Sequence, residues 1–282
     1  MLTYKYKNGP FSIIEEIGKS CSVHSTGQQS DVQLVIELLL NSEGPLLKGN
    51  HKCFELYIPN FVVDVSQRED IIFRNIHKST RADIRKAQEN KMLTYKFNEN
   101  PTDNDIREFS NLYNRFAKRK KISKCNKDKL RAIRDAHSLI MTSVQDEQEQ
   151  ILSASMLLVD KESSQLYGLY GVSNRFSHSN QENKNLIAKA NKFLQWKEIQ
   201  LAKQLGLIWY NFGGEVSRLE HQGVNDFKRR FGTSKAIDRR TYKANSFLGK
   251  ICVTLLYYKW NRYMKSYSVK PSTSGKCKVA NN

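Results

Sequence analysis

The sequence predicts an α+β fold in which a splayed, mixed and mostly antiparallel sheet is flanked by helices and preceded by an N-terminal α/β region. Three observations predict it. Short β-like runs come before any convincing helix. From Asp103 onward the order is two helices, three antiparallel strands, a helix and a strand. That strand ends in Gly213-Gly214, and this succession is expected where a sheet opens between a central pair of strands to admit a ligand.

The N-terminal elements follow from residue type and spacing. Residues 11–17, 31–40 and 54–65 are rich in β-branched and aromatic residues and predict strands. Residues 68–91 predict one helix, because isoleucines and an alanine recur at near-helical spacings among charged residues. Residues 93–97 predict the strand that follows this helix.

The next elements form the predicted antiparallel meander. An apolar stripe at offsets of three, six, seven and ten predicts a helix at residues 103–118, and a shorter basic helix follows at 127–137. Three β-like runs come next, with DEQEQ and DKESS as the hairpin ends between them: residues 138–144, 151–159 and 165–172. The sequence GLYG at residues 168–171 falls within the third strand, where it predicts a bulge better than a phosphate loop.

The C-terminal elements begin with a long helix at residues 185–205, capped by Gly206, and continue with a short strand at 207–212. Residues 247–265 predict an amphipathic helix. We therefore expect a first region at residues 1–98, a main domain at 99–265 and a mobile polar tail at 266–282.

The chain is strongly basic, with a net charge of +18 from 46 Lys and Arg against 28 Asp and Glu. The cations concentrate at residues 118–129 and 216–270. Such a field favours anionic partners such as nucleic acid, phosphorylated cofactors or acidic lipid. A solvated cationic surface without a specific partner is the alternative.

The five cysteines form no CxxC pair and no histidine stands at ligand spacing, so we expect neither a metal site nor a disulfide framework. The N-terminal residues lack the apolar core of a secretory signal, and the most apolar stretches are far shorter than the ~20 residues of a spanning helix. We expect a cytoplasmic protein without a transmembrane segment.

Three short motifs resemble the Fem-type (FemAB-like) peptidyltransferases and their single-domain relatives in the GNAT acyltransferase superfamily. They are KSTRADIRKAQEN at residues 78–90, a strand end with Tyr210, Phe212, Gly213 and Gly214, and a segment with Gly223, Val224, Phe227, Lys228, Phe231 and Gly232. The family commonly carries an Asp inside the strand motif, where this chain has Asn211. The first region would then be a reduced version of the first of two tandem family domains.

The resemblance implies a GNAT-like fold and transfer of an acyl or aminoacyl group to an amine of a cell-envelope (peptidoglycan) precursor, in cell-wall biogenesis. It implies aminoacyl-tRNA as the donor, with an acyl-CoA-dependent N-acetyltransferase as the alternative and no tightly bound cofactor. The helix-opening sequence SNRFSHSNQENKN has no glycine, so it offers fewer free backbone N–H groups to the pyrophosphate of coenzyme A. A basic nucleic-acid-binding protein that has lost its chemistry is the non-enzymatic alternative.

Acyl transfer to an amine requires a firmly bound acyl donor, an uncharged acceptor nitrogen and a group that stabilises the oxyanion. Lys228, after Phe227, is the first candidate for contact with the oxyanion or donor; from the sequence alone it is an exposed cation. Glu215, with His221 or Asp226 as alternatives, is a candidate proton acceptor, although such enzymes need no protein base if the substrates handle the proton. The substrate-binding candidates are Tyr210, Gly213, Gly214, Arg81, Arg85, Arg229 and Arg175.

Arg81 and Arg85 lie four residues apart on one predicted helix face, a spacing that suits a phosphate or carboxylate as well as simple solubility. The tyrosines and Trp260 of the C-terminal helix alternate with cations. They can pack on the sheet, stack on a single-stranded acceptor end, or lie on an anionic membrane.

Overall fold

The strands of the protein form one large sheet in the computed structural model, which describes residues 1–18, 29–40, 46–177, 181–215 and 222–268. The strand order is β1-β2-β3-β11-β5-β10-β9-β8-β7-β6, and β4 pairs with β5 off this path. The bounds are β1 Leu2–Asn8, β2 Phe11–Ile17, β3 Val32–Leu40, β4 Leu47–Asn50, β5 Cys53–Asp64, β6 Thr94–Asn98, β7 Leu139–Gln145, β8 Ile151–Asp160, β9 Gln165–Ser173, β10 Trp209–Gly214 and β11 Ser234–Ala244.

The pairing pattern confirms a mixed, mostly antiparallel sheet. Parallel pairs join β2 to β3 and β9 to β10, and the other pairs are antiparallel. The meander β7-β8-β9 is antiparallel as expected. Its register shifts between Met156 and Leu157, opposite the GLYG sequence, so that sequence contains the predicted bulge and no loop.

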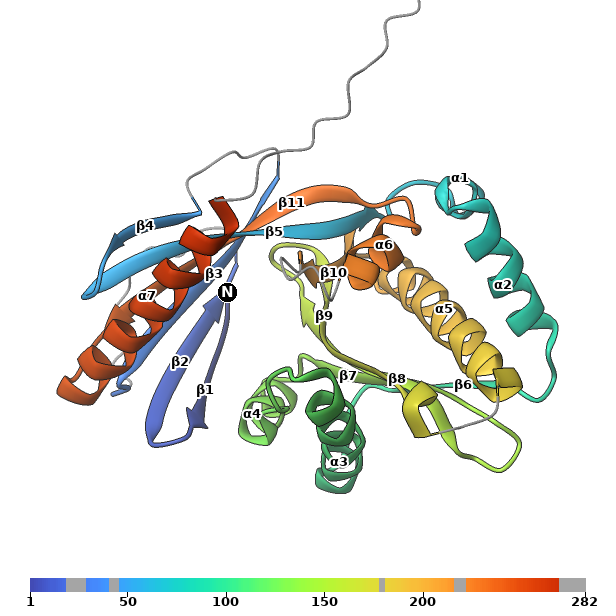
Figure 1. Cartoon of the computed structure of the whole chain (residues 1–282), viewed down its shortest axis with the longest axis horizontal. Coiled ribbons are helices and arrows are strands. Elements are labelled where there is room, and N and C mark those ends of the chain that lie inside the picture. Colours follow the sequence, from blue (N-terminus) through green and yellow to red (C-terminus); the bar gives the residue numbers. More distant parts are fainter. Residues whose placement is uncertain (19–28, 41–45, 178–180, 216–221, 269–282) are drawn as a thin grey trace, which may run out of the picture.

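Helices cover the two halves of the sheet differently (Figure 1). In the half that contains β6 to β10, α2 and α5 lie on one face, and α3 and α4 lie on the other. In the N-terminal half, α7 packs across β2, β3 and β11 and forms a third apolar core with them. The helix bounds are α1 Glu69–Asn75, α2 Lys78–Glu89, α3 Asp103–Lys120, α4 Lys127–Asp135, α5 Gln181–Gln204, α6 Gln222–Arg229 and α7 Phe247–Ser268, with a 3₁₀ turn η1 at Asn174–Ser177.

The single helix predicted at residues 68–91 is wrong, because the chain breaks at Ile76 and His77 into α1 and α2. Their ψ angles are 139° and 138°, far from the helical value. The His77 side chain accepts a hydrogen bond from the backbone N–H of Ser79 and caps α2. The Arg81 guanidinium donates to the carbonyl oxygens of Ile76, at 2.8 Å, and Arg74, so it satisfies the open end of α1.

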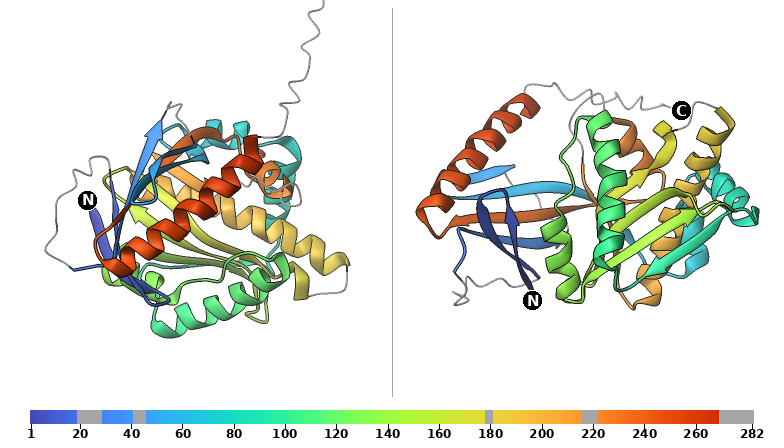
Figure 2. Two further views of the ribbon diagram at one scale, coloured as in Figure 1. Left: turned by 60° about the vertical axis from the view of Figure 1, so that its left-hand side comes forward. Right: turned by 90° about the horizontal axis from the view of Figure 1, so that it is seen from below.

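Strand β11 was not expected, and it ties the two predicted regions together. It lies between β3 and β5, antiparallel to both, although it follows them by some 170 residues or more of chain. The division of the chain at residue 98 stays a prediction, since the sheet continues through both parts (Figure 2). Residues 269–282 of the predicted tail lie outside the described part of the chain.

No helix among the described residues is long and apolar enough to cross a membrane.

Candidate active site

The sheet splits between β9 and β10. Their parallel pairing covers only Trp209 to Asn211 on β10, opposite residues 165–167 of β9. Beyond this point Gly213 takes a left-handed conformation, with φ at 76°, which favours glycine. A Cβ on Gly214 would come within 3.0 Å of Ile58 Cγ2. The two glycines therefore allow β10 to turn away from β9 while it stays close to β5.

A cavity of about 470 Å³ lies at this split. Its wall is built from β8, β9, β10, α3, α5, α6 and η1, so elements distant in sequence meet around it. Apolar surface dominates the wall, as is usual for a small-molecule site. The polar and charged side chains that reach it include Lys120, Ser155, Arg175, Gln195 and Lys228.

Lys228 is the buried cation of this cavity, with 9% of the residue exposed. Its Nζ donates hydrogen bonds to the carbonyl oxygens of Gly213, at 3.1 Å, and Gly214, at 2.7 Å. Burial lowers the pKa of Lys228 to about 8, and the charge of Glu215 opposes this shift. An ammonium has three N–H donors, so two held by carbonyls leave one for a ligand.

Helix α6 fixes Lys228 through its aromatic neighbours. Phe227 lines the cavity and packs edge-on against Phe231, with ring centroids 5.3 Å apart. Phe231 is buried and contacts Phe212 of β10. The Lys228 ammonium also lies 5.8 Å from the centre of the Phe61 ring. The motif that contains Phe227 and Lys228 therefore docks α6 onto the strand that ends in the two glycines.

Glu215 and Arg229 lie beside the cavity without lining it. Glu215 accepts from Arg229 at 3.3 Å and lies 3.7 Å from the Nζ of Lys235. Arg229 also pairs with Asp226 at 2.8 Å. These four charges form a cluster next to the strand end, and the roles of Glu215 and Arg229 in chemistry and substrate binding stay predictions. His221 lies outside the described residues.

Tyr210 lines the cavity and leads to a buried carboxylate that the sequence analysis missed. Its hydroxyl donates to Glu198 Oε2 at 2.5 Å, and the same hydroxyl oxygen lies 3.0 Å from Gln195 Oε1. Thr142 donates to the other oxygen of Glu198 at 2.6 Å. Burial raises the pKa of Glu198, and the surrounding hydrogen bonds counter only part of that rise. The signal was present, because Glu198 lies four residues after Leu194 on the apolar face of α5.

Asn211, at the position where the resembling family commonly carries Asp, is fully buried beneath the cavity. Its amide N–H donates to Gln165 Oε1 at 2.9 Å, and its oxygen accepts from the backbone N–H of Gly213 at 2.8 Å. A carboxylate can accept but cannot donate. The amide thus fits a structural role in holding the strand end.

Cations surround one side of the cavity mouth. Arg175 of η1 and Lys120 of α3 line the cavity, and a small pocket beside them is lined by Arg115 and Arg119. Arg81 and Arg85 of α2 do not line it. Arg81 bonds to the end of α1, and the Arg85 guanidinium lies 5.3 Å from the centre of the Phe73 ring. Their part in substrate binding stays a prediction.

No protein-family model matches the chain, and a search of curated proteins finds no match. Solved structures do match. FemX is 12% identical, with a TM-score of 0.54 over 84% of this chain and 82% of FemX. L-PGS from Bacillus licheniformis is 14% identical, with a TM-score of 0.50 over 90% of this chain and 85% of L-PGS. The chain therefore has a fold similar to those of FemX and L-PGS, which agrees with the resemblance of its motifs to the Fem type. Among the described residues, no group of three or more side chains could hold a metal ion.

Proposed function

We propose that the protein is a cytoplasmic acyltransferase that forms an amide bond on an amine-bearing cell-envelope precursor, with aminoacyl-tRNA as its donor. The observation that carries the proposal is the Lys228 ammonium, buried at the split of the sheet with one N–H left for a ligand. Two neutral carbonyls hold it, so its positive charge is available to a substrate. A fixed cation in the wall of a cavity is suited to stabilise a developing oxyanion.

The reaction would proceed by attack of the neutral acceptor amine on the acyl carbonyl carbon. A C–N bond forms, the ester C–O bond of the aminoacyl donor breaks, and the amine proton passes to the departing oxygen. Lys228 would stabilise the negative charge on the carbonyl oxygen, and Phe227 would help to exclude water. Tyr210 would position the reactants against the wall of the cavity, because its own hydroxyl is fixed by Glu198 and Gln195.

The charge around the cavity favours a polyanionic donor. Arg175, Lys120, Arg115 and Arg119 gather near its mouth, in a chain with a net charge of +18. Each phosphate contact with such cations releases counterions and strengthens binding. A cell-wall precursor as acceptor is what the Fem-type resemblance of the motifs implies, and the fold similarity to FemX is consistent with that resemblance. Acyl-CoA is the second candidate donor. The sequence at residues 173–185 argues against it, because it contains no glycine to expose backbone N–H groups to the pyrophosphate of coenzyme A.

The test is mass spectrometry of candidate amines incubated with the protein and either charged tRNA or acetyl-CoA. We expect an amide product with charged tRNA, and Lys228→Met to reduce the rate roughly 100- to 1,000-fold, the usual cost of losing an oxyanion donor. Lys235→Met removes a nearby but exposed cation and should keep most of the activity. If neither donor yields product while RNA binding survives Lys228→Met, the non-catalytic nucleic-acid-binding function replaces this one.

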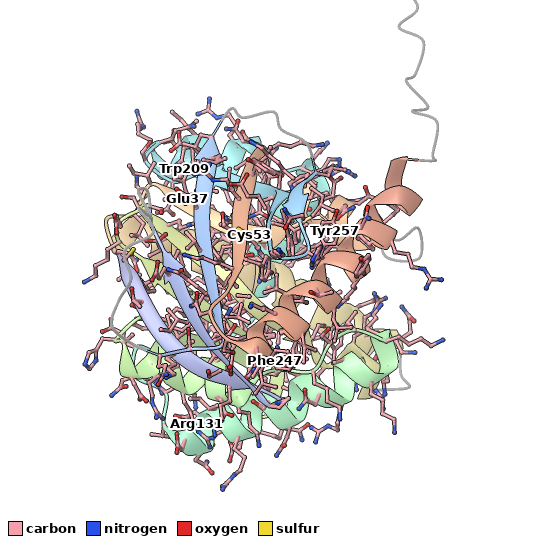
Figure 3. All side chains as sticks on the ribbon, turned by 90° about the vertical axis from the view of Figure 1, so that its left-hand side faces the viewer. Glu37, Cys53, Arg131, Trp209, Phe247 and Tyr257 are labelled. Carbon is pink, nitrogen blue, oxygen red and sulfur yellow. The ribbon has the colours of Figure 1, made fainter. Side chains whose placement is uncertain are left out.

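Helix α7 supports contact of the same protein with an anionic membrane. Its large outward side chains include Phe247, Leu255 and Tyr258, which are 76%, 63% and 60% exposed. Figure 3 shows the helix at the surface, with Phe247 at its first turn. The helix sequence contains four cations and no carboxylate. An apolar stripe with basic flanks suits a surface of acidic lipid headgroups.

Vesicle sedimentation tests this contact. We expect binding to vesicles that contain phosphatidylglycerol and much weaker binding to neutral phosphatidylcholine vesicles. The double variant F247S/L255S should lose the binding and keep amide formation on a soluble acceptor. Equal binding of the variant and the parent protein would contradict the contact.

A further inference from the structure

The turn that joins α3 to α4 carries a dense run of positive charge, which extends beyond the candidate active site. We call residues 118–127 the cationic turn. It contains no Asp or Glu, and its cations are Lys118, Arg119, Lys120, Lys121, Lys124 and Lys127. All of them are exposed except Lys120, which is partly buried and lines the cavity of the candidate active site.

The exposed cations of this turn are not balanced by carboxylates of the fold. Further along α4, Arg131 pairs with Asp128 at 3.4 Å and Arg134 pairs with Asp103 at 2.6 Å, so those charges are neutralised within the protein. Among the residues that the structure describes, none of the exposed cations of the cationic turn forms an ion pair. Like charges so close in sequence repel one another, and an anion from outside the protein relieves that repulsion.

Hydrogen bonds fix the backbone that carries these cations. Cys125 is buried, and its backbone N–H donates to Asn114 Oδ1 of α3 at 2.9 Å. Asn126 donates from its backbone N–H to the Tyr170 hydroxyl, at 3.3 Å, and from its side-chain amide to the carbonyl oxygen of Lys7, at 2.9 Å. The turn is therefore anchored to α3, β9 and β1. A partner meets a fixed arrangement of charge, and little backbone has to be ordered when it binds.

The cationic turn begins at the mouth of the candidate active site. Lys120 lines the cavity there, and Arg119 lines the small pocket beside it. Phe116 and Ser173 line both, so the two hollows adjoin. Three exposed lysines continue the positive charge from this point to the start of α4: Lys121, Lys124 and Lys127. A long polyanion with one end in the cavity can therefore follow the turn.

The side chains of the turn favour RNA over a lipid surface as this polyanion. Ile122, which is 39% exposed, is the one large apolar side chain that the turn exposes, so it has little apolar surface to enter a membrane. Helix α7 has such a surface, but it packs on the N-terminal half of the sheet, apart from α3 and α4 (Figure 1). The turn also contains no aromatic residue on which an unpaired base would stack. These properties suit a phosphate backbone whose bases are already paired.

We propose that the cationic turn binds the phosphate backbone of a base-paired RNA stem, whose single-stranded end enters the candidate active site. The proposal rests on the proposed function for its donor, tRNA, and adds a contact for the body of that RNA. Lys121, Lys124 and Lys127 each neutralise one phosphate of the stem. Because phosphates carry no sequence information, binding does not depend on the sequence of the stem.

Fluorescence anisotropy with an uncharged stem-loop RNA that has a short single-stranded 3′ end tests the contact. The variant K121Q/K124Q/K127Q should lower the slope of log affinity against log salt by about 2.7, at ~0.9 for each phosphate of a duplex. Between 50 and 200 mM salt, the affinity of the parent protein should therefore fall roughly 40-fold more than that of the variant. K124Q/K127Q keeps the C-cap of α3 at Lys121 and should lower the slope by about 1.8.

The matched control is K48Q/K52Q/K91Q, which removes the same charge from exposed lysines on other elements and should keep the slope of the parent protein. An unchanged slope in both variants of the turn, or an equal fall in the control, would overturn the proposal. Equal affinity for a single-stranded RNA of the same length would refute the stem. Loss of binding to phosphatidylglycerol vesicles in K121Q/K124Q/K127Q, with RNA binding unchanged, would assign the turn to a membrane instead.

The RNA probe carries no acyl group, so this result is independent of acyl transfer. The predicted change of slope in a protein that forms no amide from charged tRNA would refute the proposed function and support the contact. Amide formation from charged tRNA, together with an unchanged slope, would do the reverse.

Discussion

The candidate active site and a smaller cavity, which has a volume of about 170 Å³ and is lined by β9 and by the strands β2, β3 and β11 of the N-terminal half, hold lysines in opposite ways. Lys228 reaches the larger cavity and bonds only to neutral backbone carbonyls; no ion pair joins it to a described residue. Lys129 lines the smaller cavity and forms a bidentate pair with the buried carboxylate of Glu15. At both sites, removing a charge from water costs free energy. Only the first leaves that charge to be neutralised by a ligand.

The difference separates a charge that stabilises the fold from one that does not. The ion pair of Glu15 and Lys129 joins β2 to α4, and two tyrosines of β1 also donate hydrogen bonds to Glu15. The pair therefore holds the N-terminal strands against α4. Lys228 instead lowers the stability of its own site, as its reduced pKa indicates. A destabilising cation at the split of the sheet is the pattern expected of a group kept for chemistry.

The strongest test of this difference between the two sites is to replace each lysine in turn. Lys129→Met leaves the Glu15 carboxylate buried without its cation. We expect the free energy of unfolding to fall by about 3–5 kcal/mol, the usual cost of breaking a buried pair. Lys228→Met removes an unpaired buried charge and should leave the free energy of unfolding at pH 7 unchanged or higher. Urea unfolding followed by circular dichroism measures both. A larger loss in Lys228→Met than in Lys129→Met would reverse the interpretation of the two sites.

The second prediction concerns the buried carboxylate behind the larger cavity. Glu198→Gln keeps the size of the side chain but replaces one carboxyl oxygen by an NH₂ group, which then faces the hydroxyl donor of either Thr142 or Tyr210. We expect a loss of about 1–3 kcal/mol in the free energy of unfolding, from the one donor left unsatisfied. Tyr210→Phe removes one of those donors and should cost less. If the loss in Tyr210→Phe exceeds that in Glu198→Gln, Glu198 does not organise this network.

Much of the fold could be predicted from the sequence because most elements carry local patterns. The three strands of the meander, α3 and α5 have apolar periodicity that matches their burial. Strand β11 lacks such a pattern. Its central residues are Asp238, Arg239 and Arg240, which are charged and lie in the middle of the sheet. Hydrogen bonds from Arg239 to Glu37 and from Arg240 to Tyr167 help to offset the cost of burying these charges, and both partners lie far away in sequence.

The site was predictable to the same degree. The resemblance to the Fem type, not the sequence alone, predicted the ammonium of Lys228 near the strand end, where it makes two hydrogen bonds. The sequence alone predicts an exposed cation, which is wrong, because Lys228 is buried. Sequence could not reveal that Arg81 would be engaged by the end of α1, because that depends on the break at Ile76. Nor could it show that Glu215 would pair with Arg229 and not line the cavity.

A third, smaller effect concerns the salt dependence of donor binding near the larger cavity. If the donor is tRNA, its single-stranded end passes the cations near the larger cavity. The double variant R119Q/R175Q should reduce the slope of log affinity against log salt by about 1.4, at ~0.7 for each phosphate that is no longer neutralised. Between 50 and 200 mM salt, the tRNA affinity of the parent protein should therefore fall roughly 7-fold more than that of the variant. An unaltered slope would remove these arginines from the donor path.

The smallest predicted effect is the pH dependence that belongs to Lys228 alone. With its pKa at about 8, the ammonium is about nine-tenths protonated at pH 7 and half protonated at pH 8, so kcat/KM should fall about twofold over that interval. The free energy of unfolding changes the other way. The unfolded chain keeps this proton up to about pH 10.5, so the cost of burying the charge is relieved as the pH rises from about 8 toward 10.5.

The acceptor amine complicates the rate measurement, because it loses its own proton in the same range and becomes more reactive. Lys228→Arg separates the two effects, since a guanidinium stays protonated throughout. The ratio of kcat/KM for the parent protein to that for Lys228→Arg cancels the titration of the substrate. This ratio should fall about twofold from pH 7 to pH 8 and keep falling above it. A ratio independent of pH would mean that the charge on Lys228 does not act in the transition state, and the contrast between the two buried lysines would then concern stability alone.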